Sequence, residues 1–433
     1  MARALLVLPT STYRAPEFLS AARRLGVEVV TASDAPQALG GLMGDRFLEV
    51  DLSRPEEAAG RIVELAARLP LDAVLAVDDQ GGLAAAIACD RLGLPHSPPA
   101  AVAATRDKAA ARRLLGAAGV PQPAWRAVSG RPGDRAGEAE AVAAAAEELG
   151  FPVVVKPVSL SGSRGVVRAD DAASAEAAAA RVRAVLDETG EPPEVPLLVE
   201  AYVAGAEVAV EAIVREGRLE VLAVFDKPDP LEGPYFEETI YVTPSRHPGA
   251  DLAAAADAVA RAAGALGIVH GPVHAEARLA GAPATEMRPD EVRPAGARPA
   301  GARRPVVLEV AARTIGGKCS KALRFATGAS LEEIVLAGAL GRTLDSTRER
   351  AAAGVMMIPV PRSGTLDALE GADRAREVDF VTGVEITAPV GRVIRALPEG
   401  DRYLGFLFAR APTPSEVERA LRRAHAELVI KIS

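Results

Sequence analysis

A lysine stands immediately before a glycine- and serine-rich loop in the middle of the chain. Lys156 follows the β-branched run 153–155, and residues 159–166 then read SLSGSRGV. The β-branched residues favour a buried strand, and the loop can offer backbone N–H groups and hydroxyls to an anion. A lysine beside such a loop is typical of a nucleotide phosphate site. The residues by themselves leave one alternative open, a solvated hairpin that carries an incidental lysine.

Lysine is rare in this chain, so each one is informative. Of the 50 Lys and Arg residues only six are lysine. Arginine serves almost everywhere that a cation is needed, which indicates that a retained lysine acts as a compact and flexible charge. Lys108 lies in a helix predicted over 105–115, where, taken alone, it is typical of a solvated surface. Lys227, Lys318 and Lys321 are further candidates for contacts with a substrate carboxylate.

Acidic side chains lie on or directly after several predicted strands. Asp78 and Asp79 follow a strand predicted over 73–77, and ligands of parallel sheets bind at such strand ends. These two residues could face a substrate amine or a metal, and the alternative is that one of them caps the following helix. Glu211 lies in an alternating strand predicted over 207–214, and we expect it on the exposed face of that strand.

The totals fit a globular protein of several domains. At 433 residues the chain is too long for one ordinary core, and we expect two to four domains. Hydrophobic residues make up 49% and charged residues 25%, as in globular enzymes. The net charge of -8 argues against nucleic acid as the main partner. No apolar run is long enough to span a membrane, and two distant cysteines indicate a reducing cytoplasm.

The first hundred residues alternate between strand and helix patterns. The predicted elements are strands 4–8, 27–31, 47–50 and 73–77 and helices 16–25, 55–69 and 80–92. This rhythm predicts a parallel sheet covered by helices. Further along, the acidic and proline-rich segment 226–244 has the length of a functional loop, and we expect it to act as a lid. Segment 281–304 is biased toward Ala, Pro, Gly and Arg and is predicted to be a hairpin insertion without chemistry.

Four features follow one another along the chain: two isolated lysines, a glycine and serine loop, an acidic strand turn, and two carboxylates on neighbouring strands. The lysines are Lys108 and Lys156, the acid at the turn is Glu200, and the paired carboxylates are Glu276 and Glu309. In this order they resemble the ATP-grasp superfamily, and more narrowly the carboxylate–amine ligases that include the L-amino acid ligases. The resemblance covers nearly the whole chain. It implies an α/β fold with an N-terminal parallel-sheet domain, ATP-grasp α+β domains and a small C-terminal α+β cap.

The resemblance implies an ATP site. Lys108 and Lys156 would reach the ATP phosphates, and a loop would close over them through its backbone N–H groups. The loop residues are Ser161, Gly162, Ser163 and Gly165. The implied adenine-binding hinge consists of Glu200, Ala201, Tyr202 and Val203. Glu207 matches the acid that holds the ribose hydroxyls.

The resemblance also implies a metal site and a catalytic arginine. Glu276 and Glu309 match the metal ligands, and two carboxylates with phosphate oxygens suffice for Mg²⁺, with Mn²⁺ as the alternative ion. The superfamily usually has Asn two positions after the second glutamate, where this chain has Ala311, so a third side-chain ligand is missing. Arg313 matches the arginine that stabilises the transferring phosphoryl group and the acyl phosphate. His274 shares a strand face with Glu276 by period-two alternation and would point toward the acceptor, unless it is a structural histidine.

The implied activity is that of an ATP-dependent ligase, which joins a carboxylate of an amino acid to an amine through an acyl phosphate and releases ADP and phosphate. The partners are these small molecules, and the expected assembly is a homodimer. The implied domains are a substrate domain over 1–100, a small subdomain region with the phosphate loop over 101–200, a large subdomain with the metal site over 201–345, and a cap over 346–433. Two alternatives stay open. One is a biotin- or purine-pathway carboxylase of the same superfamily, and the other is an ATP-binding protein without catalysis, because Ala311 departs from the metal pattern.

Overall fold

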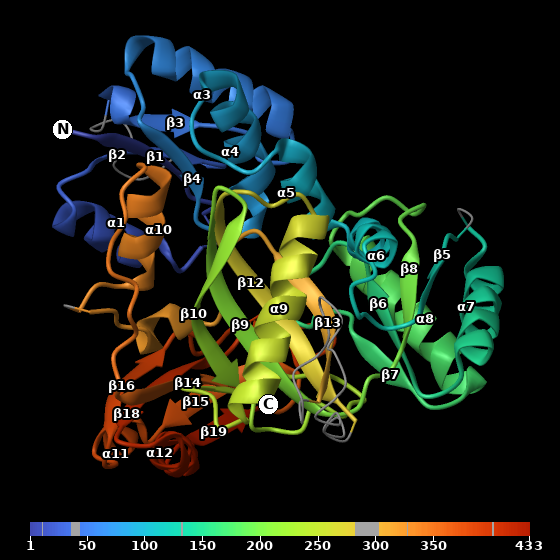
Figure 1. The fold of residues 1–433 in the computed structure, drawn as a ribbon. Coiled ribbons are helices and arrows are strands. Elements are labelled where there is room, and N and C mark those ends of the chain that lie inside the picture. The colour runs from blue at the N-terminus through green and yellow to red at the C-terminus, as the bar shows by residue number, and fades with distance from the viewer. Residues whose placement is uncertain (11, 36–43, 131–132, 282–302, 327, 401) are drawn as a thin grey trace, which may run out of the picture.

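The computed structural model describes residues 1–10, 12–35, 44–130, 133–281, 303–326, 328–400 and 402–433. Figure 1 shows the longest sheet in the middle of the molecule, with the N-terminal elements in blue on one side and a smaller sheet in cyan and green on another. Most of the predicted insertion 281–304 lies outside the described residues. Among the helices of the described ranges, none is both long and apolar enough to cross a membrane.

The N-terminal residues form a parallel sheet, as their alternating pattern predicts. Its strands, in spatial order, are β3 (Phe47–Glu49), β2 (Glu28–Ser33), β1 (Arg3–Val7) and β4 (Ala73–Ala76). The helices of this part are α1 (Ala15–Arg24), α3 (Pro55–Arg68) and α4 (Asp79–Leu92). Gly93 ends α4 in the left-handed conformation, with a φ of +66° that glycine adopts without strain. The carboxyl end of β4 leads directly into Asp78 and Asp79.

Two short helices replace the single helix predicted over 105–115. The first, α5 (Pro99–Arg106), ends before Asp107, whose backbone is extended, and α6 (Lys108–Ala117) begins directly after it. The Asp107 side chain accepts hydrogen bonds from two N–H groups in the first turn of α6 and so caps this helix. The predicted helix start was therefore wrong, and Lys108 is the first residue of α6.

A second sheet carries the predicted phosphate loop. Its strands, in spatial order, are β5 (Trp125–Val128), β8 (Leu197–Ala201), β6 (Val153–Pro157) and β7 (Val167–Ala169), and they are antiparallel. The helices α7 (Arg135–Leu149) and α8 (Ala172–Glu188) pack against it and share one hydrophobic cluster with it. The glycine and serine loop joins β6 to β7, which confirms the predicted order of strand, loop and strand.

The central sheet has eight strands and combines the middle of the chain with its end. From one edge to the other they are β13 (Arg304–Ala311), β12 (Gly271–Ala280), β9 (Ala206–Arg215), β10 (Arg218–Asp226), β11 (Ile240–Thr243), β14 (Ala352–Ile358), β18 (Gly405–Ala411) and β16 (Val381–Ile386). Neighbouring strands are antiparallel throughout. Because β11 falls inside the segment predicted as a lid, the end of that segment belongs to the sheet rather than to a loop.

The C-terminal residues, predicted as a small cap, are divided between two sheets. β14, β18 and β16 extend the central sheet, whereas β17 (Val393–Ile394), β15 (Gly364–Glu370) and β19 (Val429–Ile432) form a three-stranded sheet. The helix α12 (Pro414–Ala426) packs under the central sheet, and the short α11 (Ala372–Arg376) lies beside it. The central sheet has strands on both sides of residue 345, the predicted boundary between the large subdomain and the cap. The four domain ranges stay predictions.

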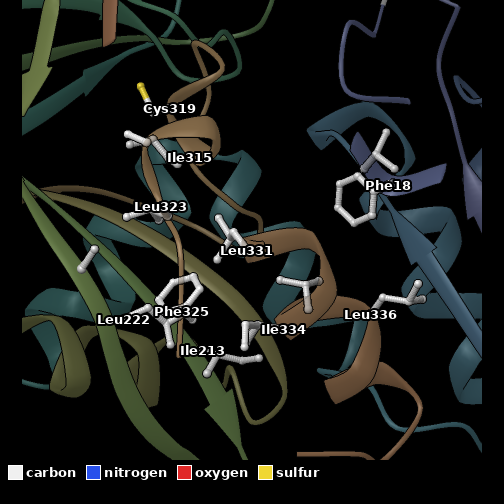
Figure 2. Packing of buried hydrophobic residues seen from close by; sticks show 14 of the residues in the cluster. Phe18, Ile213, Leu222, Ile315, Cys319, Leu323, Phe325, Leu331, Ile334 and Leu336 are labelled. Atoms are coloured by element: carbon white, nitrogen blue, oxygen red, sulfur yellow. The ribbon is translucent and has the colours of Figure 1, made fainter. Parts of the chain in front are cut away.

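A hydrophobic cluster joins the N-terminal domain to the central sheet (Figure 2). Phe18 of α1 lies on one side of α10 (Leu331–Ala339), and Ile213 of β9 lies on the other side. The segment between β13 and α10, which includes the short helix η2 (Cys319–Ala322), contributes Ile315 to the same cluster. The helix α9 (Gly249–Ala265) packs on a separate cluster with the alternate residues of β9. The N-terminal domain is thereby held close to the residues that follow β13.

Candidate active site

One face of the central sheet is apolar, and the other carries the predicted site residues of strands β9, β12 and β13. In β9, Val210 and Ala212 pack beneath α9. Because successive side chains of a strand point to opposite faces, Glu207 and Glu211 project from the other face. The register of β12 with β9 pairs His274 with Glu211, which extends this polar face across both strands.

The two predicted metal ligands lie directly opposite one another. The antiparallel register of β12 and β13 pairs Glu276 with Glu309, so both side chains leave the same face of the sheet. A β-bulge follows directly after Glu276. Alternation and strand order therefore bring the two carboxylates together, while their binding of a metal stays a prediction.

Glu276 belongs to a group of three carboxylates, which we call the carboxylate cluster: Glu207, Glu238 and Glu276. One oxygen of each lies within 4.8 Å of the others. The ammonium of Lys227 lies among them, with Nζ 2.7 Å from Glu207, 2.8 Å from Glu238 and 2.6 Å from Glu276. Arg278 donates to the second oxygen of Glu207 over 3.0 Å. The sequence did not lead us to Glu238 or to this position of Lys227. The rarity of lysine was the one available signal for Lys227.

Burial acts against the charged forms of Lys227, Glu238 and Glu276, and the charges around each of them oppose this effect or add to it. Burial alone would lower the pKa of Lys227, but the three carboxylates raise it well above its usual range. Burial raises the pKa of Glu238 to about 7, with Lys227 opposing this shift and Glu276 adding to it. Burial would also raise the pKa of Glu276, but Lys227 and His274 hold it well below its usual range. The charges of the cluster therefore depend on one another.

Glu211 is buried, in contrast to the exposed position predicted from its strand. Its side chain is 0% exposed and accepts hydrogen bonds from the Ile315 N–H over 3.1 Å. His274 Nδ1 lies 3.3 Å from Glu211, and His274 Nε2 lies 3.8 Å from Glu276. Burial would lower the pKa of His274, but these two carboxylates raise it. The prediction was wrong because the segment after β13 covers this face, and a strand pattern does not show such long-range packing.

Arg313 links the central sheet to the N-terminal domain. Its Nε donates a hydrogen bond to Asp79 over 2.6 Å. Arg14 of the N-terminal domain donates to the carbonyl of Val77 over 2.8 Å and to the carbonyl of Thr314 over 3.0 Å. Burial would lower the pKa of Arg313, but Asp79 raises it; burial would raise the pKa of Asp79, but Arg313 lowers it. Asp78 occupies the N-cap position of α4 without a side-chain capping bond. The capping alternative is therefore wrong for Asp78, and Asp79 orients the arginine.

Lys156 is buried in a network with two other charged residues. Its Nζ lies 2.8 Å from one oxygen of Glu200, whose other oxygen accepts a hydrogen bond from Arg112 over 2.6 Å. Burial would raise the pKa of Glu200, but Arg112 and Lys156 lower it to about 2, so the carboxylate stays ionised. Burial lowers the pKa of Lys156. The Glu200 side chain thus has two protein partners, and its role at an adenine ring stays a prediction.

Lys108 connects the glycine and serine loop to Glu309, one of the two predicted metal ligands. Its N–H donates to Val158 over 3.0 Å, and its Nζ donates to the carbonyl of Leu160 over 2.6 Å. The same Nζ lies 3.6 Å from Glu309. A narrow cleft between α6 and β13 is lined by residues that include Lys108, Arg112 and Glu309. Two lysines thus flank the loop: Lys156 precedes it on β6 and is buried, and Lys108 contacts its backbone and lines this cleft.

The predicted adenine hinge spans the last two residues of β8 and the two that follow it. The N–H groups of Ala201 and Tyr202 donate to backbone carbonyls over 2.9 and 3.0 Å. The carbonyl of Val203 accepts a hydrogen bond from Arg278 over 2.6 Å, and the Arg278 guanidinium lies 5.0 Å from the centroid of the Tyr202 ring. These groups of the hinge bond to the protein, and their contacts with a nucleotide stay predictions.

The glycine and serine loop and helix α8 contact the segment 395–399 through residues that we call the clasp: Gly165, Arg181, Glu188, Arg395, Pro398 and Glu399. The Gly165 N–H donates to the carbonyl of Pro398 over 2.9 Å. Arg181 binds Glu399 and Arg395 binds Glu188, each over 2.5 and 3.1 Å. Ser161 and Gly162, at the tip of the loop, are exposed, and Ser163 is half-buried. Sequence reasoning missed the clasp, because its ion-pair partners are 218 and 207 residues apart.

Lys318 and Lys321, candidate contacts for a substrate carboxylate, both bind a carboxylate of the chain itself. Their Nζ atoms lie 2.6 and 2.5 Å from Glu385 of β16. The preceding Gly317 has a φ of +58°, and a Cβ there would overlap the side chain of Met357. The turn after Arg313 therefore requires glycine for close packing within the protein, and contacts with a substrate stay a prediction.

Three family models match separate parts of the chain. The ATP-grasp N-terminal domain matches residues 19–96, the ATP-grasp domain matches residues 149–297, and the L-amino acid ligase C-terminal domain 2 matches residues 356–433. Together they cover strands β2, β3 and β4 of the N-terminal sheet, the glycine and serine loop with the carboxylate cluster, and the C-terminal strands.

Known proteins are similar over larger spans. The crystal structure of L-amino acid ligase from Bacillus licheniformis has a TM-score of 0.77 and 26% identity, over 100% of this chain and 99% of that chain. Alanine–anticapsin ligase of Bacillus subtilis is 26% identical over 66% of this chain and 58% of its own length. Carnosine synthase 1 of Gallus gallus is 30% identical over 60% of this chain, which spans 29% of that protein. The chain belongs to the ATP-grasp superfamily and is a ligase that resembles the L-amino acid ligases.

Proposed function

We propose that the protein uses ATP to join the carboxylate of an amino acid to an amine, through an acyl phosphate. ADP and phosphate are released. One observation carries the proposal: Glu276 and Glu309 oppose one another on a single face, with Lys108 of the phosphate side 3.6 Å from Glu309. The similarity to alanine–anticapsin ligase and carnosine synthase supports an amino acid as the acid.

The proposed ATP contacts come from α6, from β6 of the second sheet and from the loop that follows β6. Lys108 and Lys156 bind phosphates, and the N–H groups of the exposed loop tip at Ser161 and Gly162 are directed to the same group. The position of Lys108 supports this arrangement, because its Nζ donates to the loop carbonyl of Leu160 and lies 3.6 Å from the carboxylate of Glu309. Phosphate bound beside Lys108 lies next to both the loop and the metal ligands.

The metal ligands of the proposal are Glu276 and Glu309. Their carboxylate oxygens suit Mg²⁺, or Mn²⁺ as the alternative. When bound, the ion neutralises charge on the phosphoryl group that is transferred. Ala311 pairs with His274 across the strands and offers no side-chain ligand, so the proposal assigns the metal to these two glutamates.

The reaction has two displacement steps. In the first, an oxygen of the substrate carboxylate bonds to the γ-phosphorus of ATP, and the bond to the ADP oxygen breaks. In the second, the amine nitrogen bonds to the acyl carbon, phosphate leaves and the amine loses a proton. Arg313, held by Asp79 over 2.6 Å, stabilises the negative charge that develops on the acyl phosphate. His274, held between Glu211 and Glu276, faces the acceptor side.

The test is release of ADP with Mg-ATP across a matrix of L-amino acids, singly and in pairs, with bicarbonate as a separate arm. We expect release that requires an acid and an amine together, and loss of that release in Glu309→Ala. Glu370→Ala is the matched control, because Glu370 is an exposed glutamate that pairs with Lys431. Release that depends on bicarbonate would instead indicate a carboxylase. Nucleotide binding without any release would indicate a binding protein, and either result would overturn the proposal.

A further inference from the structure

A cation already occupies the carboxylate cluster. The Lys227 side chain is 3% exposed, and its ammonium lies within 2.8 Å of an oxygen from each of the three carboxylates. Glu309 differs, because its contact with Lys108 is longer, at 3.6 Å, and its side chain is 30% exposed. The two predicted metal ligands therefore have different surroundings, one bound to a buried ammonium and one partly open.

The charges of the cluster are largely balanced without a metal. Lys227 and Arg278 offset two of the three carboxylates, and the His274 ring lies 3.8 Å from Glu276, the third. A divalent ion that entered here would add two positive charges to this buried group, or it would have to displace Lys227 from three hydrogen bonds. Either change leaves buried charge without a partner, which is costly.

The position of Lys227 is fixed by more than its ion pairs. Its backbone N–H donates to the carbonyl of Glu207 over 3.3 Å, at the end of β10. Its Nζ also lies 5.1 Å from the centroid of the Tyr241 ring, a favourable site for a cation. A backbone hydrogen bond, the Tyr241 ring and three carboxylates thus hold the ammonium at the centre of the cluster.

We propose that Lys227 is the resident cation of the carboxylate cluster and keeps divalent metal out of it until nucleotide binds. Metal then enters with the phosphates, on the open side of the site at Glu309. Lys227 is a positioning residue in this account, because it holds Glu276 in place for the metal that arrives with the nucleotide. The inference rests on the proposed function for the choice of nucleotide, but its test needs no turnover.

The test is a titration with Mn²⁺, in which binding is measured as the loss of the free-ion signal in electron paramagnetic resonance. Without nucleotide, we expect wild type to bind Mn²⁺ at the cluster only weakly, at or beyond the limit of the titration. Lys227→Met keeps the length of the side chain but removes its charge, and it should bind Mn²⁺ at least about tenfold more tightly than wild type, because three carboxylates are then free to act as ligands. Lys431→Met is the matched control, since Lys431 pairs with an exposed glutamate, and it should behave as wild type. In the presence of a non-hydrolysable ATP analogue, wild type should bind Mn²⁺ tightly.

Two results would overturn the proposal. One is tight binding of Mn²⁺ by nucleotide-free wild type that disappears in Glu276→Gln. The other is folded Lys227→Met, or the milder Lys227→Gln, without any gain in Mn²⁺ affinity. The comparison of wild type with Glu276→Gln decides even where the Lys227 variants fail to fold. If the Mn²⁺ pattern holds while the amino acid matrix releases no ADP, the resident-cation proposal stands and the ligase proposal alone is overturned.

Discussion

The carboxylate cluster and the clasp are both networks of ion pairs, and they differ in burial. In the cluster, the side chains of Lys227 and Glu207 are 3% and 7% exposed. In the clasp, Arg181 and Glu399 are 43% and 26% exposed. The hydrogen-bond lengths in the two networks are similar, so the distances alone do not distinguish them.

Burial decides what each network contributes. An exposed ion pair gains little, because water screens the charges and the side chains lose entropy. A buried pair is desolvated, and the removal of one partner leaves a charge that nothing solvates. We therefore expect the cluster to fix the positions of its side chains strongly, and the clasp to hold the glycine and serine loop weakly enough for the loop to open.

The largest expected effect is on catalysis, at the arginine that Asp79 holds. Arg313→Ala should lower kcat by about 10²–10³-fold, because it removes a preorganised charge from the developing acyl phosphate. Steady-state assays of ADP release measure this change. Arg374→Ala provides the control, since Arg374 is an exposed arginine that binds Glu427. A kcat within a few-fold of wild type for Arg313→Ala would remove this residue from the mechanism.

The next effect is on stability, within the cluster itself. Lys227→Met should lower the free energy of unfolding by about 3–5 kcal/mol, because it leaves buried carboxylates without their cation. Urea denaturation measures this change, and added Mn²⁺ should restore part of it. A loss below about 1 kcal/mol would mean that the cluster behaves as an exposed network does.

A second buried network gives a prediction that depends on pH. The pKa of Glu200 is lowered from 4.5 to about 2, so its pairing adds stability above pH 4.5 and loses it as the pH falls toward 2. Glu200→Gln should therefore be less stable than wild type by about 3 kcal/mol at pH 7. The difference should shrink at pH 3 in urea denaturation. A difference that stays constant with pH would contradict the ionised pairing of Glu200 with Lys156 and Arg112.

The smallest effect is expected at the clasp. Glu399→Gln should change the free energy of unfolding by less than about 1 kcal/mol, because its ion pair with Arg181 is partly solvated. Added salt should reduce even this difference. Urea denaturation at low and high ionic strength provides the measurement, and a change as large as that of Lys227→Met would erase the contrast between the two networks.

Local patterns were sufficient for the elements that carry the site. The β-branched run before Lys156 predicted a strand, and the glycines after it predicted a loop, which is what β6 and β7 form. Alternation along β12 placed His274 and Glu276 on one face, and the structure places their side chains 3.8 Å apart. These predictions succeeded because each depends on neighbours within one or two strands.

Contacts between distant segments could not be predicted in this way. Glu211 has the pattern of a half-exposed strand, and it is buried because Ile315, 104 residues later, packs over it. The place of Lys227 among three carboxylates depends on β9, β12 and the segment before β11 coming together. The continuation of the central sheet into β14 and β18 likewise depends on strand pairing that no local pattern specifies.

The central claim is the acyl phosphate, and labelled oxygen tests it most directly. The amino acid whose carboxylate reacts would carry ¹⁸O in that group, and the phosphate released during amide formation would be examined by mass spectrometry. We predict that one ¹⁸O atom moves from the carboxylate to each phosphate released, because the carboxylate oxygen that attacks ATP leaves with the phosphate. Release of unlabelled phosphate together with formation of the amide would contradict the mechanism.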